Sequence, residues 1–265
     1  MSAIRRSAVA GRFYPREPAD LAVQVAEYIA RAAPGDVRAP KALIAPHAGY
    51  MYSGPVAGTA YARLAPLAGR ISRVVLAGPA HRVYVPGVAI PSASAFDSPL
   101  GAVELDAEAL ALLRSLPFVE VSDEAHALEH SLEVHVPFLQ SVLGRFRLVP
   151  IVVGDATPAQ VARMFDALWG GDETLIVVSS DLSHYLPYAQ ACERDRATAA
   201  AIVGLDARLD PEEACGAAPI NGLLEAARAR GLSAELLDLR TSGDTAGDRD
   251  RVVGYGAFAF CPRTP

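Results

Sequence analysis

Four short apolar runs most constrain the fold of this chain. Each run is apolar at almost every position instead of alternating with polar residues, which is typical of strands covered on both faces. The runs span residues 41–46, 73–77, 147–153 and 174–179. Stretches that favour helices lie around them, at 18–33, 53–66, 131–144, 157–169 and 188–204. These helices are long enough for crossover connections, so the sequence predicts an α/β fold with a central, mostly parallel sheet flanked by helices.

The remaining segments fit the same sheet. Residues 83–105 hold five prolines and glycines around short apolar pieces, which predicts a hairpin excursion. Residues 234–239 and 252–260 are expected to form a closing pair of strands, separated by a polar surface loop at 241–251. No repeat, low-complexity linker or shift in composition divides the 265 residues. We therefore expect one domain over residues 1–265.

Composition excludes several classes of protein. With 24 basic and 30 acidic residues the net charge is −6, so the chain lacks the basic footprint of a nucleic-acid-binding protein. Hydrophobic residues make up 51 % of the chain, which excludes a disordered tail or a small disulfide scaffold. The cysteines Cys192, Cys215 and Cys261 are odd in number and lack CxxC spacing. They predict neither a disulfide framework nor a zinc ribbon, and they favour a cytoplasmic location.

The uncharged stretch at 42–62 is long enough to be tested as a membrane span. Pro46, Pro55, His47 and three glycines interrupt it, and in lipid such breaks leave backbone groups without hydrogen-bond partners. A buried strand, a polar loop and a helix of small residues explain the stretch better. We therefore expect no contact with a membrane.

Histidines follow three of the four apolar runs. His47, His81 and His184 each come a few residues after a predicted strand. Because the carboxyl ends of parallel strands gather at one edge of the sheet, these side chains are expected to converge on one crevice. Two histidines and one anionic ligand leave open positions for a substrate or oxygen, as in non-haem iron sites. The spacing therefore favours a metal site.

The anionic ligand has two candidates. Asp181 lies three residues before His184, so both side chains can reach the same mouth. Cys215 is predicted to lie in a turn between two helices, where Gly216 allows close backbone approach. Taken alone, this cysteine is more simply explained as a small buried side chain. The other two cysteines are interpreted as structural.

A second polar group precedes and opens the helix predicted at 131–144. Its members are His126, Glu129, His130, Glu133 and His135. The histidine pair at i, i+4 superficially resembles a zincin motif, but alanine stands where that motif has its catalytic glutamate. Two interpretations stay open: a polar helix start capped by Ser131, or a second wall of the pocket. The histidines of this group receive no assigned role.

Several segments in a fixed order resemble the Memo family. They are Val9-Ala-Gly-Arg-Phe-Tyr-Pro15, Ala45-Pro-His-Ala-Gly-Tyr50, Gly78-Pro-Ala-His81, Glu129-His-Ser-Leu-Glu-Val-His135, Ser179-Ser-Asp-Leu-Ser-His184, and Cys215 before Pro219-Ile220. The resemblance extends to Gly254-Tyr-Gly256 and so covers nearly the whole chain. It implies the fold of class III extradiol dioxygenases of the LigB kind.

Resemblance to Memo proteins also implies a site. The family pattern maps a metal onto His47, His81 and Cys215, where the related dioxygenases have a carboxylate in place of the cysteine. A thiolate selects copper(I) or iron, so the expected cofactor is an iron or copper ion. His184 matches the dioxygenase residue that moves protons, and Asp181 would orient or complete the site. Prokaryotic members resemble a partner of a radical SAM protein, and eukaryotic members are linked to phosphotyrosine peptides.

Two functions fit these features. The first is a metal-dependent oxidoreductase that acts on a small molecule, with His184 as general acid or base. The second is a non-catalytic module that holds a metal, a peptide or a partner protein in a dioxygenase-like pocket. The presence of His184 and Asp181 favours the enzyme, because a scaffold needs no proton-transfer residue. The cysteine in place of the carboxylate favours the module.

Overall fold

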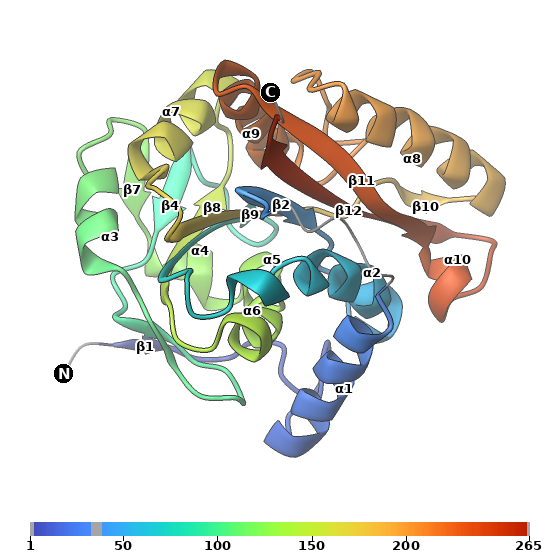
Figure 1. The fold of residues 1–265 in the computed structure, drawn as a ribbon, viewed down its shortest axis with the longest axis horizontal. Coiled ribbons are helices and arrows are strands. Elements are labelled where there is room, and N and C mark those ends of the chain that lie inside the picture. The colour runs from blue at the N-terminus through green and yellow to red at the C-terminus, as the bar shows by residue number, and fades with distance from the viewer. Residues whose placement is uncertain (1–2, 33–38, 264–265) are drawn as a thin grey trace.

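One mixed sheet forms the middle layer of the computed structural model, which describes residues 3–32 and 39–263 (Figure 1). The strand order is β10-β12-β2-β9-β3-β8-β4-β7, and β11 pairs with β12. These strands are β2 (Ala42–Ala45), β3 (Arg73–Pro79), β4 (Val88–Ile90), β7 (Val119–Val121), β8 (Arg147–Val153), β9 (Thr174–Ser179), β10 (His184–Leu186), β11 (Leu232–Thr241) and β12 (Val252–Pro262). A separate small sheet contains β1 (Ile4–Arg5), β5 (Ala95–Phe96) and β6 (Val103–Glu104).

The centre of the main sheet is parallel and its flanks are antiparallel. β2 pairs with β9, β9 with β3, and β3 with β8, all in parallel. β12 joins β2 in antiparallel orientation, and β4 joins β8 in the same way. Every residue of β2 and β9 is buried, as expected for strands with helices on both faces. The predicted α/β class is confirmed; the parallel arrangement holds for the centre of a mixed sheet.

Helices cover both faces of the sheet. They are α1 (Pro18–Ala30), α2 (Tyr50–Ala62), α3 (Ala107–Leu113), α4 (Asp123–Ala127), α5 (His130–Glu133), α6 (Val136–Leu143), α7 (Pro158–Leu168), α8 (Tyr188–Val203), α9 (Ala217–Ala229) and α10 (Ser242–Thr245), with a 3-10 helix at Ala65–Leu67. In Figure 1, α1, α2, α5 and α6 lie below the sheet, and α7, α8 and α9 lie above it. Both layers share one hydrophobic core with the sheet. No helix in the described ranges is long and apolar enough to cross a membrane.

The helix predicted over 131–144 is in fact two helices. α5 ends at Glu133, and α6 begins at Val136. Pro137 has no backbone N–H to donate to the carbonyl of Glu133, and proline is tolerated in the first turn of a helix but not in its interior. The prediction of one continuous helix was therefore wrong at this point. Because of the break, α5 packs against β3 independently and carries His130 to the edge of the sheet.

The other expected segments form as strands or turns. The excursion at 83–105 adds β4 to the main sheet, and its β5 and β6 form the predicted hairpin, which pairs with β1. β11 and β12 are the expected closing pair. The loop at 241–251 contains the short helix α10, which Thr241 caps through its side chain.

Candidate metal centre

The carboxyl ends of the parallel strands bring two predicted histidines together. β2 ends at Ala45 and β3 at Pro79, and in both cases a histidine follows two residues later. The rings of His47 and His81 have centroids 5.1 Å apart. His130 joins them from the start of α5, and one nitrogen of each ring lies within 4.8 Å of the other two. Three histidines from three elements therefore meet at one place.

Burial and a hydroxyl fix the ring of His47. The residue is 2 % exposed, and its Nδ1 lies 2.6 Å from Ser179 Oγ. Ser179 Oγ donates its own proton to the carbonyl of Ser131 at 2.6 Å, so it accepts from Nδ1–H. The lone pair is then on Nε2, 3.4 Å from Cys215 Sγ. Burial and the neighbouring histidines lower the pKa of His47 well below 6.5, which keeps the ring neutral and able to bind a cation.

A buried carboxylate fixes His81. Glu129 is 1 % exposed, and its Oε2 accepts a hydrogen bond from the backbone N–H of His81 at 2.7 Å. Its Oε1 lies 2.9 Å from His81 Nδ1 and also caps α5 by accepting from Ser131 N–H at 2.9 Å. Burial raises the pKa of Glu129, but the hydrogen bonds it accepts from His81 and Ser131 outweigh burial and lower the pKa to about 2. Glu129 is therefore an anion, and Nε2 of His81 is left for another partner.

His130 is the member of the cluster that the sequence left unassigned. It stacks on His81, with centroids 4.8 Å apart and an interplanar angle of 23°. Its Nδ1 is buried 3.5 Å from a Glu129 oxygen and has no hydrogen-bond partner among the described residues. Burial lowers the pKa of His130 to about 4, so the ring is neutral near pH 7. Within the described ranges, His126 Nδ1 and His135 Nε2 are also buried without a partner, so it is the meeting with His47 and His81 that distinguishes His130.

Cys215 and Asp181 both contact the His47 segment. Cys215 lies between α8 and α9, as predicted, but it does not belong to the group whose ligand atoms lie within 4.8 Å of one another. Asp181 Oδ1 accepts from the backbone N–H of His47 at 2.8 Å, and Oδ2 lies 3.9 Å from Nε2. Burial raises the pKa of Cys215 to about 12 and that of Asp181 to about 7. An ion bound by the cysteine would have to displace the thiol proton.

His184 lies beside the cluster without belonging to it. It begins β10, and burial is the main cause that lowers its pKa, with a smaller effect from His81. The next residue, Tyr185, is 62 % exposed and has a φ of 57°. Left-handed backbone is strained for tyrosine, and such strain is concentrated at functional sites. The position of His184 is compatible with contact to a bound substrate.

The rest of the second polar group is structural. His126 Nε2 lies 3.1 Å from a backbone carbonyl, and His135 Nδ1 lies 2.7 Å from a tyrosine hydroxyl. Glu133 holds the N-terminal segment, by contacts with Arg5, Ala8, Val9 and Tyr14. Of this group, only Glu129 and His130 therefore take part in the histidine cluster, and the cap of α5 is Glu129 instead of Ser131.

The donor set fits a transition-metal ion. Imidazole suits iron, copper and zinc, and a thiolate adds preference for softer ions. Such ions take nitrogen at about 2.0–2.1 Å, so ligand atoms on one ion lie up to about 4 Å apart. Small side-chain rotations bring three nitrogens that lie within 4.8 Å into that range. His47 and His81 also direct Nδ1 at protein acceptors, as metal-bound histidines do.

A cavity of about 250 Å³ opens beside Cys215. Its walls are mainly apolar, with Val83, Tyr84 and Val85 on one segment and Ala217 and Ala218 at the start of α9. Of the described residues, Asp155 is the one charged residue that lines it. Its size suits a small molecule, since a cavity of about 150 Å³ accepts a benzene ring.

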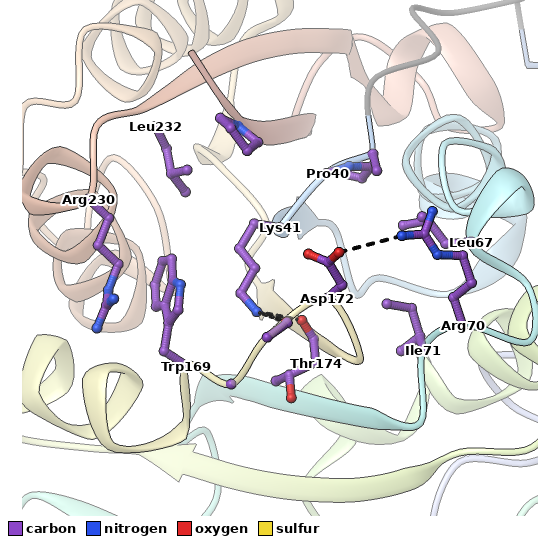
Figure 2. A pocket seen from close by; sticks show the side chains of 14 residues that line it. Pro40, Lys41, Leu67, Arg70, Ile71, Trp169, Asp172, Thr174, Arg230 and Leu232 are labelled. Atoms are coloured by element: carbon purple, nitrogen blue, oxygen red, sulfur yellow. Dashed lines mark hydrogen bonds and ion pairs between the residues drawn. The ribbon is translucent and has the colours of Figure 1, made fainter. Parts of the chain in front are cut away.

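A larger cavity, of about 450 Å³, lies at the opposite, amino-terminal edge of the parallel strands (Figure 2). Lys41, directly before β2, donates to the carbonyls of Gly171 and Thr174, both at 2.7 Å. Figure 2 shows the indole of Trp169 between Lys41 and Arg230, whose charged groups lie 5.5 and 4.3 Å from its centroid. No histidine or cysteine lines this cavity. The candidate functional site is therefore the histidine cluster.

Comparison with known proteins finds relatives along nearly the whole chain. The family described as "Memo-like protein" matches residues 5–259. A MEMO1 family protein of Methanothermobacter thermautotrophicus is 38 % identical over 95 % of this chain and 98 % of its own length. One from Methanopyrus kandleri is 38 % identical over 97 % of this chain and 98 % of its own, and one from Aquifex aeolicus is 35 % identical over 97 % and 99 %.

A solved structure supports the fold alone. The crystal structure of uncharacterized protein JW3007 from Escherichia coli K12 superposes with a TM-score of 0.51 at 16 % identity, over 82 % of this chain and 98 % of that one. The match of the family and of its members spans nearly every residue of this chain. The chain belongs to the Memo family.

Proposed function

We propose that this chain binds a non-haem iron or copper ion and uses it in oxidation–reduction chemistry on a small molecule. The observation that carries the proposal is the meeting of His47, His81 and His130 with nitrogens within 4.8 Å. Protonated rings at that distance would repel one another, whereas neutral rings can share a cation.

The third ligand is open to two side chains. Family resemblance favours Cys215, whose Sγ lies 3.4 Å from His47 Nε2. Proximity favours His130, which shares the 4.8 Å group with both other histidines. A thiolate is the better ligand for copper(I), and an imidazole also suits divalent ions. We propose Cys215 as the ligand for a soft ion, with His130 at the opening where a substrate would bind.

Side chains near the ion have separate roles in the proposed reaction. The ion, when bound, supplies electron transfer. His184 is neutral at pH 7 because its pKa is lowered, so it can take a proton from a substrate. Asp181 holds the His47 segment by its hydrogen bond to the backbone, and its pKa of about 7 allows it to keep or release a proton near neutral pH. The mainly apolar cavity beside Cys215 offers space for a small substrate.

A non-catalytic binding module is the second candidate, and one surface feature favours it. Met51, Tyr84, Leu128 and Tyr185 are between 57 and 75 % exposed, and each lies within four residues of a histidine at the site. Exposed apolar side chains are typical of a surface that another molecule covers. A protein partner, such as the radical SAM protein implied by the family resemblance, would bury these side chains.

Metal analysis of protein purified without chelator tests the proposal. Wild type should carry iron or copper, and His47→Ala and His81→Ala should lose it. Cys215→Ser should lower copper binding more than iron binding, because only copper(I) strongly prefers sulfur. Equal metal content in wild type and the two histidine variants would overturn the site.

Oxygen uptake separates the enzyme from the module. His184→Ala should keep the metal and lose turnover if the residue moves protons. Ring cleavage of catechols should be weak or absent, because a thiolate changes the charge and redox potential of iron. A protein that binds metal but consumes no oxygen with any reduced small molecule favours the module.

A further inference from the structure

The tripeptide Glu129–Ser131 links the three histidines of the cluster. Glu129 holds His81 by two hydrogen bonds, at 2.7 and 2.9 Å, and His130 is itself a member of the cluster. Ser131 accepts the proton of Ser179 at its carbonyl, and Ser179 in turn faces His47 Nδ1. The segment 129–131 therefore connects all three rings.

The same tripeptide is fastened tightly to the end of β3. Ser131 Oγ donates to the carbonyl of Pro79 at 3.0 Å, two residues before His81. A Cβ atom on Gly78 would lie 2.9 Å from Ser131 Oγ and 3.1 Å from Ser179 Cβ, so only glycine allows this approach. The supports are thus fixed relative to the strands that carry the histidines.

This arrangement decides which nitrogen of each ring carries the proton. A carboxylate can only accept, so Glu129 requires a proton on His81 Nδ1. Ser179 Oγ has its proton committed to the Ser131 carbonyl, so it requires a proton on His47 Nδ1. In the neutral form of both rings the lone pair is then on Nε2.

We infer that Glu129 and Ser179 are positioning residues, which hold His81 and His47 with the proton on Nδ1 and Nε2 ready for a metal ion. The inference rests on the proposed metal-binding function. Glu129 has a further effect, because its anionic oxygen lies 2.9 Å from one ring and 3.5 Å from another. Its negative charge attracts a cation to the cluster without becoming a ligand.

The first test needs no metal. Long-range proton–nitrogen NMR spectra of metal-free protein labelled with ¹⁵N-histidine at pH 7.5 show which ring nitrogen carries the proton. In wild type, His47 and His81 should both be protonated on Nδ1. Glu129→Gln should alter the pattern of His81 alone, and Ser179→Ala that of His47 alone. A wild-type protein with the proton on Nε2 of either ring would overturn the inference.

The second test measures affinity with a matched control. Glu129→Gln should weaken binding of iron(II) or copper(I) about 10- to 100-fold, the range seen when a carboxylate that supports a metal-bound histidine is removed. Glu133→Gln is the control, because this carboxylate is equally buried on the same helix but contacts the N-terminal segment. It should lower the melting temperature and leave both affinity and ring protonation unchanged.

The outcomes separate the positioning role from a structural one and from the proposed function. Wild-type affinity in Glu129→Gln, or an equal loss of affinity in Glu133→Gln, would contradict the inference. A wild type that binds neither metal overturns the proposed function, and the NMR test on metal-free protein then still decides the proton positions. Should Glu129→Gln fail to fold, Ser179→Ala and the wild-type spectrum keep the inference open to refutation.

Discussion

Ionisable side chains lie at both edges of the parallel strands, but their interactions with the rest of the protein differ between the two edges. At the amino edge, Lys41, shown in Figure 2, has two carbonyl partners. Arg230 pairs with Asp166 at 2.8 Å. At the carboxyl edge, His130 keeps a buried nitrogen without a partner among the described residues. Lys41 and Arg230 at the amino edge therefore have partners within the fold, whereas the histidine cluster at the carboxyl edge has ring nitrogens that can still bind a ligand.

Titration behaviour sharpens the contrast. Burial lowers the pKa of Lys41 to about 8, yet its hydrogen bonds to two carbonyls suit the charged ammonium, so its role is to join β2 to the turn before β9. Burial keeps His47 and His130 of the carboxyl edge neutral, and a neutral imidazole is the form that binds metals. The paired charges around the amino-edge cavity therefore indicate a structural role, and the free lone pairs of the histidine cluster indicate a ligand-binding site.

The largest expected effect comes from removing a histidine ligand. His81→Ala should weaken iron and copper binding by more than about 100-fold, a larger loss than for a supporting residue. Lys41→Met, at the other edge, should leave metal binding at the wild-type level. Titration of metal-free protein measures both. Equal losses in the two variants would remove the distinction between the edges.

Acid should destabilise the metal-free protein through histidines outside the cluster. Burial lowers the pKa of His126 to about 4 and that of His135 to about 3. Between pH 6.5 and 4 these two histidines are protonated in the unfolded chain but stay neutral in the folded protein. The free energy of unfolding therefore falls as the pH is lowered. Each contributes up to about 1.4 kcal/mol per pH unit. Asp181, with its pKa raised to about 7, opposes this trend over the same window.

Urea unfolding at a series of pH values with chelator present checks the acid effect. Replacing both His126 and His135 by glutamine should reduce the slope between pH 6.5 and 4 without abolishing it, because His47, His130 and His184 also have lowered pKa values. An unchanged slope in this double variant would show that other groups control acid stability.

The smallest effect is expected at the amino edge. Lys41→Met removes two hydrogen bonds from a charged donor, which should lower the free energy of unfolding by about 1–3 kcal/mol. Denaturant titration with chelator present measures the loss. A variant as stable as wild type would mean that Lys41 is not a structural tie, and the cavity in Figure 2 would then need another explanation.

Local pattern was sufficient for the strands and for two of the clustered histidines. β8 and β9 have the bounds that their apolar runs predict, because strands buried on both faces leave an unbroken signal. His47 and His81 come together because both follow parallel strands, and that rule needs only the strand positions.

The local sequence pattern could not predict that His130 belongs to the cluster. Its position depends on the break between α5 and α6 at Pro137 and on Glu129, which reaches back to His81 across 48 residues of sequence. The proline was visible in the sequence, but the direction of the short helix before it depends on packing against β3. The neighbouring glutamate was the one signal that could have marked this histidine.

Anomalous X-ray scattering from crystals loaded with iron(II) or copper(I) tests the central claim most directly, because it locates the ion itself. The expected result is one peak within about 2.0–2.3 Å of Nε2 of both His47 and His81, with Cys215 or His130 as the next neighbour. The carboxylate of Glu129 should lie outside bonding distance of that peak. A peak at the amino edge, or one bound by neither His47 nor His81, would contradict the assignment of the metal centre.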